Sequence, residues 1–300
     1  MTALYNDIQR KLDEYDSTQN NILVGIHDPI QKDVLVRQII DSIRRINYVT
    51  ILVRREWAVT RTNSHHNTFD PLMAAAWYVR NHNFEEALWL IFLYIHFGKN
   101  ASTGWNLIQA VYGHLGASPI WNYANTSTNI DDFIDWLDDE QDEIKRHGKF
   151  CNHRKYQSLS ATSRTGTGAT IKSFIRIVPQ LLPINTPAGN RGELFEHYYK
   201  IMGEVIGFGR LAKFDFLTML GKMNILPIEP AHPYLQGATG PIAGAKKLYG
   251  FENREISITD LNALIADLGN YLGLYFVMQI LEDSLCNWQK DTTNYQRFRG

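Results

Sequence analysis

Apolar residues recur every three or four positions over most of this chain, which is the spacing of one buried face of an α-helix. Clear stripes of this kind lie at Val34–Ile46, Leu88–Ile95, Leu194–Val205 and Leu261–Leu272. No segment alternates convincingly between apolar and polar residues, as a half-buried strand does. Val49–Val53 fits either a short strand or an extension of the preceding helix. The pattern therefore predicts an all-α fold.

Capping residues and loops divide these stripes. Asp70 before Pro71 has the position of a helix N-cap, and Ser257 with Asp260 resembles a capping box. The irregular, Pro- and Gly-containing stretches are Ser158–Thr170, Pro179–Gly192 and Pro227–Pro241. We interpret the second of them as a seam between an N-terminal helical region, residues 1–185, and a C-terminal one, residues 186–300. The two regions would form lobes of one integrated globular unit.

Composition is that of an ordinary globular protein of 300 residues, with 44% hydrophobic and 20% charged residues. No apolar run is long enough for a membrane span, and the N-terminus lacks the basic and apolar regions of a secretory signal. The two cysteines, Cys151 and Cys286, have neither metal-type spacing nor a disulfide framework. We therefore expect a cytoplasmic protein with no metal site and no cofactor.

The net charge of −1 conceals an asymmetry along the chain. Asp131–Glu143 contains eight acids and no base, so the remainder is net basic, and Lys145–Lys155 then carries five Lys or Arg residues and no acid. Local basic surface governs binding to DNA phosphates more than total charge does. A solvated acidic helix face beside a basic loop explains the same pattern. The charge distribution permits DNA binding without requiring it.

A Gly-apolar-Gly turn stands between two helical stripes, at Gly207 and Gly209, with Arg210 and Lys213 directly after it. Glycines allow a tight reversal and let backbone N–H groups approach a phosphate, and the N-terminus of the following helix favours an anion. Arg210 and Lys213 add cations at the same place. This arrangement resembles a DNA-binding helix–hairpin–helix motif, although a simple helix–helix turn has the same pattern.

Two carboxylates follow the turn. Asp215 lies in the second helical stripe, and Glu229 lies twenty residues after Gly209, behind Leu226-Pro227-Ile228. In DNA glycosylases of the helix–hairpin–helix superfamily a catalytic carboxylate, usually Asp, follows the hairpin at a similar distance. Cleavage of an N-glycosidic bond develops positive charge on the sugar, which a carboxylate stabilises, or the carboxylate activates the attacking water. We place Glu229 ahead of Asp215, whose alternative role is to pair with a nearby cation.

The residue two positions after the second hairpin glycine bears on the reaction type. Bifunctional members of that superfamily carry a Schiff-base lysine there, whereas this chain has Leu211. We therefore expect monofunctional hydrolysis that leaves an abasic site. The four-cysteine cluster of some members is missing as well.

Several blocks of sequence point to a narrower family. They are Phe69–Leu72, His96–Lys99, Asn152–Leu159, Phe216–Lys222, Pro227–Pro230, Gln236–Pro241 and Glu282–Lys290. Together, over roughly residues 55–300, they resemble proteins described as alpha-glutamyl/putrescinyl thymine pyrophosphorylase, clade 3. The resemblance implies a modified-DNA substrate. It extends to bacterial phage-defence glycosylases that sense viral base modification, such as glucosylated hydroxymethylcytosine.

Other polar residues complete the predicted site. We expect phosphate contacts from His153, Arg154 and Lys155, with Tyr156 and Gln157 in a pocket for the flipped base. A plain surface loop is the alternative.

The C-terminal region adds three residues to the predicted base pocket. They are Tyr234, Gln236 and Trp288. The alternatives are that Tyr234 and Gln236 lie in an irregular connector and that Trp288 is a packing residue.

Three hypotheses follow. The first is a monofunctional DNA glycosylase that removes a hypermodified base from phage DNA, as an antiviral defence. The second is a transferase or pyrophosphorylase that processes hypermodified thymine, and the third is a non-catalytic module that binds modified DNA. The expected partner in each is double-stranded DNA with modified bases, and neither a membrane nor an obligatory protein partner is inferred.

Overall fold

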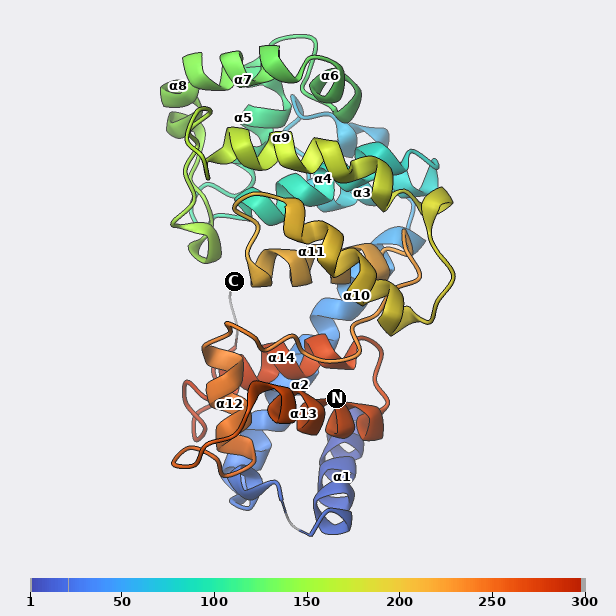
Figure 1. Cartoon of the computed structure of the whole chain (residues 1–300), viewed down its shortest axis with the longest axis vertical. Coiled ribbons are helices and arrows are strands. Elements are labelled where there is room, and N and C mark those ends of the chain that lie inside the picture. The colour runs from blue at the N-terminus through green and yellow to red at the C-terminus, as the bar shows by residue number, and fades with distance from the viewer. Residues whose placement is uncertain (1, 21, 298–300) are drawn as a thin grey trace. The chain divides into compact units, whose positions relative to one another are not determined.

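The computed structural model describes residues 2–20 and 22–297, which form fourteen α-helices and no strand (Figure 1). The predicted all-α class is confirmed. Val49–Val53 belongs to the long helix α2 (Pro29–Arg54), so it extends that helix and is not a strand.

The described residues divide into two compact units. The first consists of the chain up to Tyr48 and from Glu229 onward, and the second is Val49–Ile228. Helix α2 contributes residues to both units. Residues 185 and 186 both fall in the second unit, and the lobe seam that we expected between them stays a prediction.

The first unit is a small helical assembly. Besides the first part of α2 it contains α1 (Thr2–Thr18), α12 (Gly240–Leu248), α13 (Ile258–Leu272) and α14 (Val277–Trp288). Each helix turns an apolar stripe to a shared core. Leu12 of α1 is fully buried there, which explains why this amphipathic helix docks on α13.

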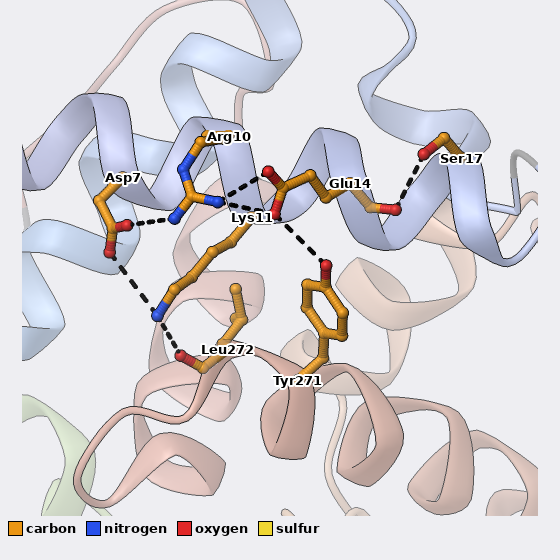
Figure 2. A network of polar contacts seen from close by, with 7 residues as sticks. All are labelled: Asp7, Arg10, Lys11, Glu14, Ser17, Tyr271 and Leu272. Carbon is orange, nitrogen blue, oxygen red and sulfur yellow. Dashed lines mark hydrogen bonds and ion pairs between the residues drawn. The ribbon is translucent and has the colours of Figure 1, made fainter.

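Polar contacts at the edge of that core hold α1 on α13, as Figure 2 shows. The ammonium of Lys11 donates to the Leu272 carbonyl at 2.8 Å, and the Tyr271 hydroxyl donates to Glu14 at 3.4 Å. The last carbonyls of a helix lack intrahelical donors, so a lysine supplies one here. Gly273 ends α13 with a φ of +62°, a left-handed conformation that favours glycine.

The second unit is larger and surrounds one apolar helix. Its helices are α3 (Pro71–Arg80), α4 (Phe84–Phe97), α5 (Asn106–Tyr112), α6 (Tyr123–Thr128), α7 (Ile130–Asp139), α8 (Gln141–His147), α9 (Thr167–Ile177), α10 (Arg191–Ile201) and α11 (Arg210–Lys222), together with the end of α2. Helix α4 is buried on nearly all sides and packs against α3, α5, α6 and α11. A helix that is apolar all round is stable only in a core, which places α4 at the centre of this unit.

The N-caps predicted from sequence are present. The Asp70 carboxylate accepts hydrogen bonds from the N–H groups of Leu72 and Met73, each at 3.0 Å. The Ser257 hydroxyl accepts one from the N–H of Asp260, also at 3.0 Å. Both caps supply acceptors for the first N–H groups of a helix, which have no intrahelical partner.

Candidate functional site

The turn between α10 and α11 lies where the glycine pattern predicted a reversal. After α10 a short 3₁₀ turn, Met202–Glu204, leads into the reversal, and α11 begins at Arg210 with Gly209 as its N-cap. The Lys213 N–H donates to the Gly209 carbonyl at 3.0 Å, the first bond of the helix. The start of α11 agrees with the sequence-based expectation, whereas α10 ends earlier than the apolar stripe up to Val205 indicated; the DNA-binding role of this hairpin stays a prediction.

The two glycines of the turn have different requirements. Gly207 has a φ of +72°, and a Cβ there would lie 3.1 Å from the Thr170 hydroxyl. Gly209 has an ordinary φ of −69°, and a Cβ there would meet no atom within 4 Å. Folding therefore needs glycine at 207, whereas at 209 glycine leaves the backbone at the start of α11 open to an approaching group.

An aromatic stack fixes the turn to the core of the second unit. Phe208, between the two glycines, is buried, and its ring centroid lies 5.4 Å from that of Phe92. Phe92 in turn stacks on Phe174 of α9 at 4.0 Å. These contacts hold the turn rigidly against α4 and α9, which preorganises its exposed backbone.

The basic loop before α9 also reaches the turn. Arg154 has only 10% of its side chain exposed; its Nε donates to the Ile95 carbonyl at 2.9 Å, and its guanidinium lies 3.5 Å from the Asp215 carboxylate of α11. The Gln157 amide donates to the Gly207 carbonyl at 3.4 Å. The loop and the turn, about fifty residues apart in sequence, thus form one surface.

A pocket of about 190 Å³ opens at this junction. It is lined by His96, His153, Arg154, Gln157, Gly207, Phe208, Gly209, Leu211 and Ala212. The volume is below the about 300–1,000 Å³ typical of pockets for drug-sized ligands, so it suits a small group. Its polar lining offers hydrogen-bond donors from Arg154 and Gln157, and Asp215 is linked to it through Arg154. Such a pocket is suited to an anion.

His96 is a lining residue that sequence reasoning did not assign to the site. It is buried; its Nε2 lies 3.0 Å from the Thr167 hydroxyl, which itself donates to the Ser158 carbonyl. Because that hydroxyl has one proton, Nε2 must carry the hydrogen of the imidazole. Burial, and next the charge of Arg154, lower the pKa of His96 to about 3. The ring is neutral near pH 7, so the positive charge it faces belongs to Arg154.

The other predicted cations lie over aromatic rings. The Arg210 guanidinium is 5.6 Å from the Phe214 ring centroid, and the Lys213 ammonium is 4.3 Å from that of Tyr199. Burial lowers the pKa of Lys213, and the charge of Glu196 opposes this shift. Neither cation lines the pocket, so their contribution would be to the charge around the turn.

The two candidate carboxylates belong to different units. Asp215, partly exposed, lies in the second unit beside Arg154. Glu229 is the first residue of the other part of the chain, and its carboxylate accepts a hydrogen bond from the Phe276 N–H at 2.8 Å, at the start of α14. This hydrogen bond holds the Glu229 side chain in place at the N-terminus of α14. Its catalytic role stays a prediction.

Of the five predicted base-pocket residues, Gln157 lines the pocket at the hairpin. Tyr156 is 90% exposed, and Gln236 is exposed as well. The Tyr234 ring stacks on that of His232 at 4.1 Å. Trp288 is fully buried in the core of the first unit, where its indole N–H donates to the Gln31 carbonyl at 3.0 Å. The structure therefore gives Trp288 a packing environment.

Among residues 2–20 and 22–297 no three His, Cys, Asp or Glu side chains are grouped closely enough to hold a metal ion. No single helix in the described part of the chain has the length and apolarity of a membrane span; α13 and α14 satisfy that test only as a pair bent by 116°.

Comparison with known proteins gives one match. The sequence profile of the family described as alpha-glutamyl/putrescinyl thymine pyrophosphorylase, clade 3, matches residues 30–300. The match confirms the resemblance predicted from the blocks of sequence. Neither a curated protein nor a solved structure matches the chain.

Proposed function

Because the chain belongs to the alpha-glutamyl/putrescinyl thymine pyrophosphorylase clade 3 family, we propose that it processes a hypermodified base in DNA, as a monofunctional N-glycosylase that leaves an abasic site. The observation that carries the proposal is the hairpin pocket, where the open N-terminus of α11 lies beside Arg154. A DNA phosphate bound there would fix the strand next to the extruded nucleotide.

The chemistry then requires one carboxylate. Glu229 stabilises the oxocarbenium-like sugar as the base leaves, or activates the water that captures it. Asp215 holds Arg154 in the orientation in which it meets the phosphate. Leu211, which lines the pocket, has no amine to attack the sugar, so the reaction ends at the abasic site.

A second candidate is a transferase or pyrophosphorylase that acts on hypermodified thymine. The family description favours it, since it names a thymine pyrophosphorylase. The donor-rich pocket suits a pyrophosphate group as well as a DNA phosphate. This reaction would leave the N-glycosidic bond intact, which separates it from the first candidate.

The experiment incubates the purified chain with duplexes that differ in one base. The bases are thymine, hydroxymethyluracil, putrescinyl thymine, glutamyl thymine and glucosylated hydroxymethylcytosine, each with and without pyrophosphate. Alkali-labile sites on a modified duplex, independent of pyrophosphate, support the glycosylase. A change in the modified base that occurs only with pyrophosphate and leaves no alkali-labile site supports the second candidate and contradicts the first.

A further inference from the structure

The most exposed large apolar side chain in the described part of the chain lies next to the hairpin surface, which Arg154 and Gln157 form with the turn at Gly207. Tyr156 is 90% exposed. An isolated exposed aromatic residue needs no explanation by itself. The position of Tyr156, one residue before the Gln157 that bonds the turn, calls for one.

The backbone on both sides of Tyr156 is anchored. The Arg154 side chain donates to the Ile95 carbonyl at 2.9 Å, and the Gln157 N–H donates to the Arg154 carbonyl at 2.9 Å. The Gln157 side chain reaches the Gly207 carbonyl, and Leu159 is buried two residues later. A loop anchored on both sides thus presents an exposed aromatic ring.

A cation lies over this ring, and the stretch of sequence around it is basic. The Lys155 ammonium lies 5.0 Å from the Tyr156 ring centroid. The segment Gly148–Thr167 has four Lys or Arg residues and no Asp or Glu. On the other side of the contact between Gln157 and the turn, Ile206 precedes Gly207 and is 42% exposed. An exposed ring with a lysine over it complements a polyanion whose bases offer flat apolar faces.

We propose that Tyr156 is a positioning residue that inserts into the base stack of DNA held at the hairpin. This inference rests on the proposed function, because it takes DNA as the ligand. When an enzyme extrudes a base it pays for lost stacking, and a side chain that fills the gap or stacks on the neighbouring base reduces that cost. Lys155, over the same ring, would meet the adjacent phosphate.

The test measures binding and stacking without requiring base release. The probe is a short duplex with one tetrahydrofuran abasic-site analogue and a 2-aminopurine base beside it, whose fluorescence reports its stacking. Tyr156→Ala should weaken binding to this duplex roughly 10- to 100-fold, and the fluorescence change should be lost. Tyr156→Phe keeps the ring and should restore both.

Ile184→Ala is the matched control, since Ile184 is 88% exposed in the same unit and lies outside the hairpin surface. It should bind like the wild type. Equal affinity and an equal fluorescence change for Tyr156→Ala and the wild type would overturn the insertion while leaving the proposed function intact. If the wild type binds neither this duplex nor a modified one, both proposals fail.

Discussion

Arg154 is the side chain on which the account of the pocket most depends. Its guanidinium is nearly buried and bonded to a carbonyl of α4 and to Asp215 of α11, so its direction is set by two helices. Buried charges of this kind persist when partners satisfy them. Leu211 and His96 complete the pocket beside it and lead to separate predictions.

Leu211→Lys should convert part of the activity into strand cleavage. Leu211 lines the pocket, so a lysine there would bring its amine into the site. Attack of that amine on C1′ displaces the base, and opening of the C1′–O4′ bond of the sugar then gives a Schiff base, which borohydride reduces to a stable cross-link between protein and DNA. Denaturing electrophoresis after borohydride treatment detects it, with Leu211→Met as the control. Base release without any cross-link would mean that Leu211 does not face the sugar.

His96 predicts a loss of stability in acid. The folded ring stays neutral down to about pH 3, whereas the unfolded chain takes up the proton below about pH 6.5. Above about pH 6.5 His96 is neutral in both states and does not make the free energy of unfolding depend on pH. Between about pH 6.5 and 3 only the unfolded chain takes up the proton, so the free energy of unfolding falls by up to about 1.4 kcal/mol for each pH unit.

Urea unfolding of the wild type and of His96→Phe at several pH values checks this. The phenylalanine keeps the stacking on Phe92 and cannot take up a proton. The free energy of unfolding should decline less steeply with falling pH in the variant. The difference in slope should correspond to the uptake of about one proton on unfolding. Parallel curves for the two proteins would show that His96 is not the group responsible.

At the scale of elements, sequence periodicity predicted the positions of the helices well. The stripes at Val34–Ile46 and Leu261–Leu272 became α2 and α13, and the caps at Asp70 and Ser257 formed, because both signals act within one or two helical turns. The pocket was only partly predictable. Arg154, Gln157 and the glycines came from local patterns. His96 joins them because α4 packs against the turn through Phe92 and Phe208 and because His96 bonds Thr167, and both contacts are distant in sequence.

The turn between α10 and α11 gives a matched pair of substitutions. Gly207→Ala should destabilise the protein by about 1–2 kcal/mol or more, since its positive φ strains any residue with a Cβ and Thr170 is close. Gly209→Ala should cost less, about 0.5–1 kcal/mol, because its φ suits alanine and the space is open, whereas alanine is a poorer N-cap than glycine.

DNA affinity should fall in Gly209→Ala, the variant of the two that loses less stability. The methyl group of Gly209→Ala would stand where a phosphate approaches the start of α11, so binding to duplex DNA should weaken several-fold in a protein of nearly normal stability. Urea unfolding and fluorescence anisotropy measure the two quantities. If Gly209→Ala binds DNA like the wild type, the phosphate does not lie at this turn.

At the scale of the whole molecule, the residues of the predicted site are divided between the two units. The hairpin pocket and Asp215 belong to the second, and Glu229 to the first. The spacing of twenty residues between Gly209 and Glu229 can be counted in the sequence. A local pattern does not show, however, that the two residues belong to different units. The assignment of the carboxylate is therefore decided by substitution.

Glu229→Gln should lower the rate of base release by about 10²- to 10⁴-fold, because the catalytic charge is lost. The amide keeps an oxygen that accepts the Phe276 N–H, so folding and DNA affinity should be retained. Asp215→Asn should remain active with weaker DNA binding, since it holds Arg154 less firmly. Single-turnover kinetics measure both, and an active Glu229→Gln beside an inactive Asp215→Asn would reverse the assignment.

The most direct test of the account is a mass balance on one reaction. Duplex DNA with a hypermodified base is incubated with the wild-type chain, and the free base and the abasic sites are quantified by mass spectrometry. A monofunctional glycosylase should yield equal amounts of the two, with the strand uncut and no requirement for pyrophosphate. Two results would contradict the glycosylase proposal. In one, the protein binds the modified DNA and every N-glycosidic bond stays intact. In the other, the base is changed only when pyrophosphate is supplied.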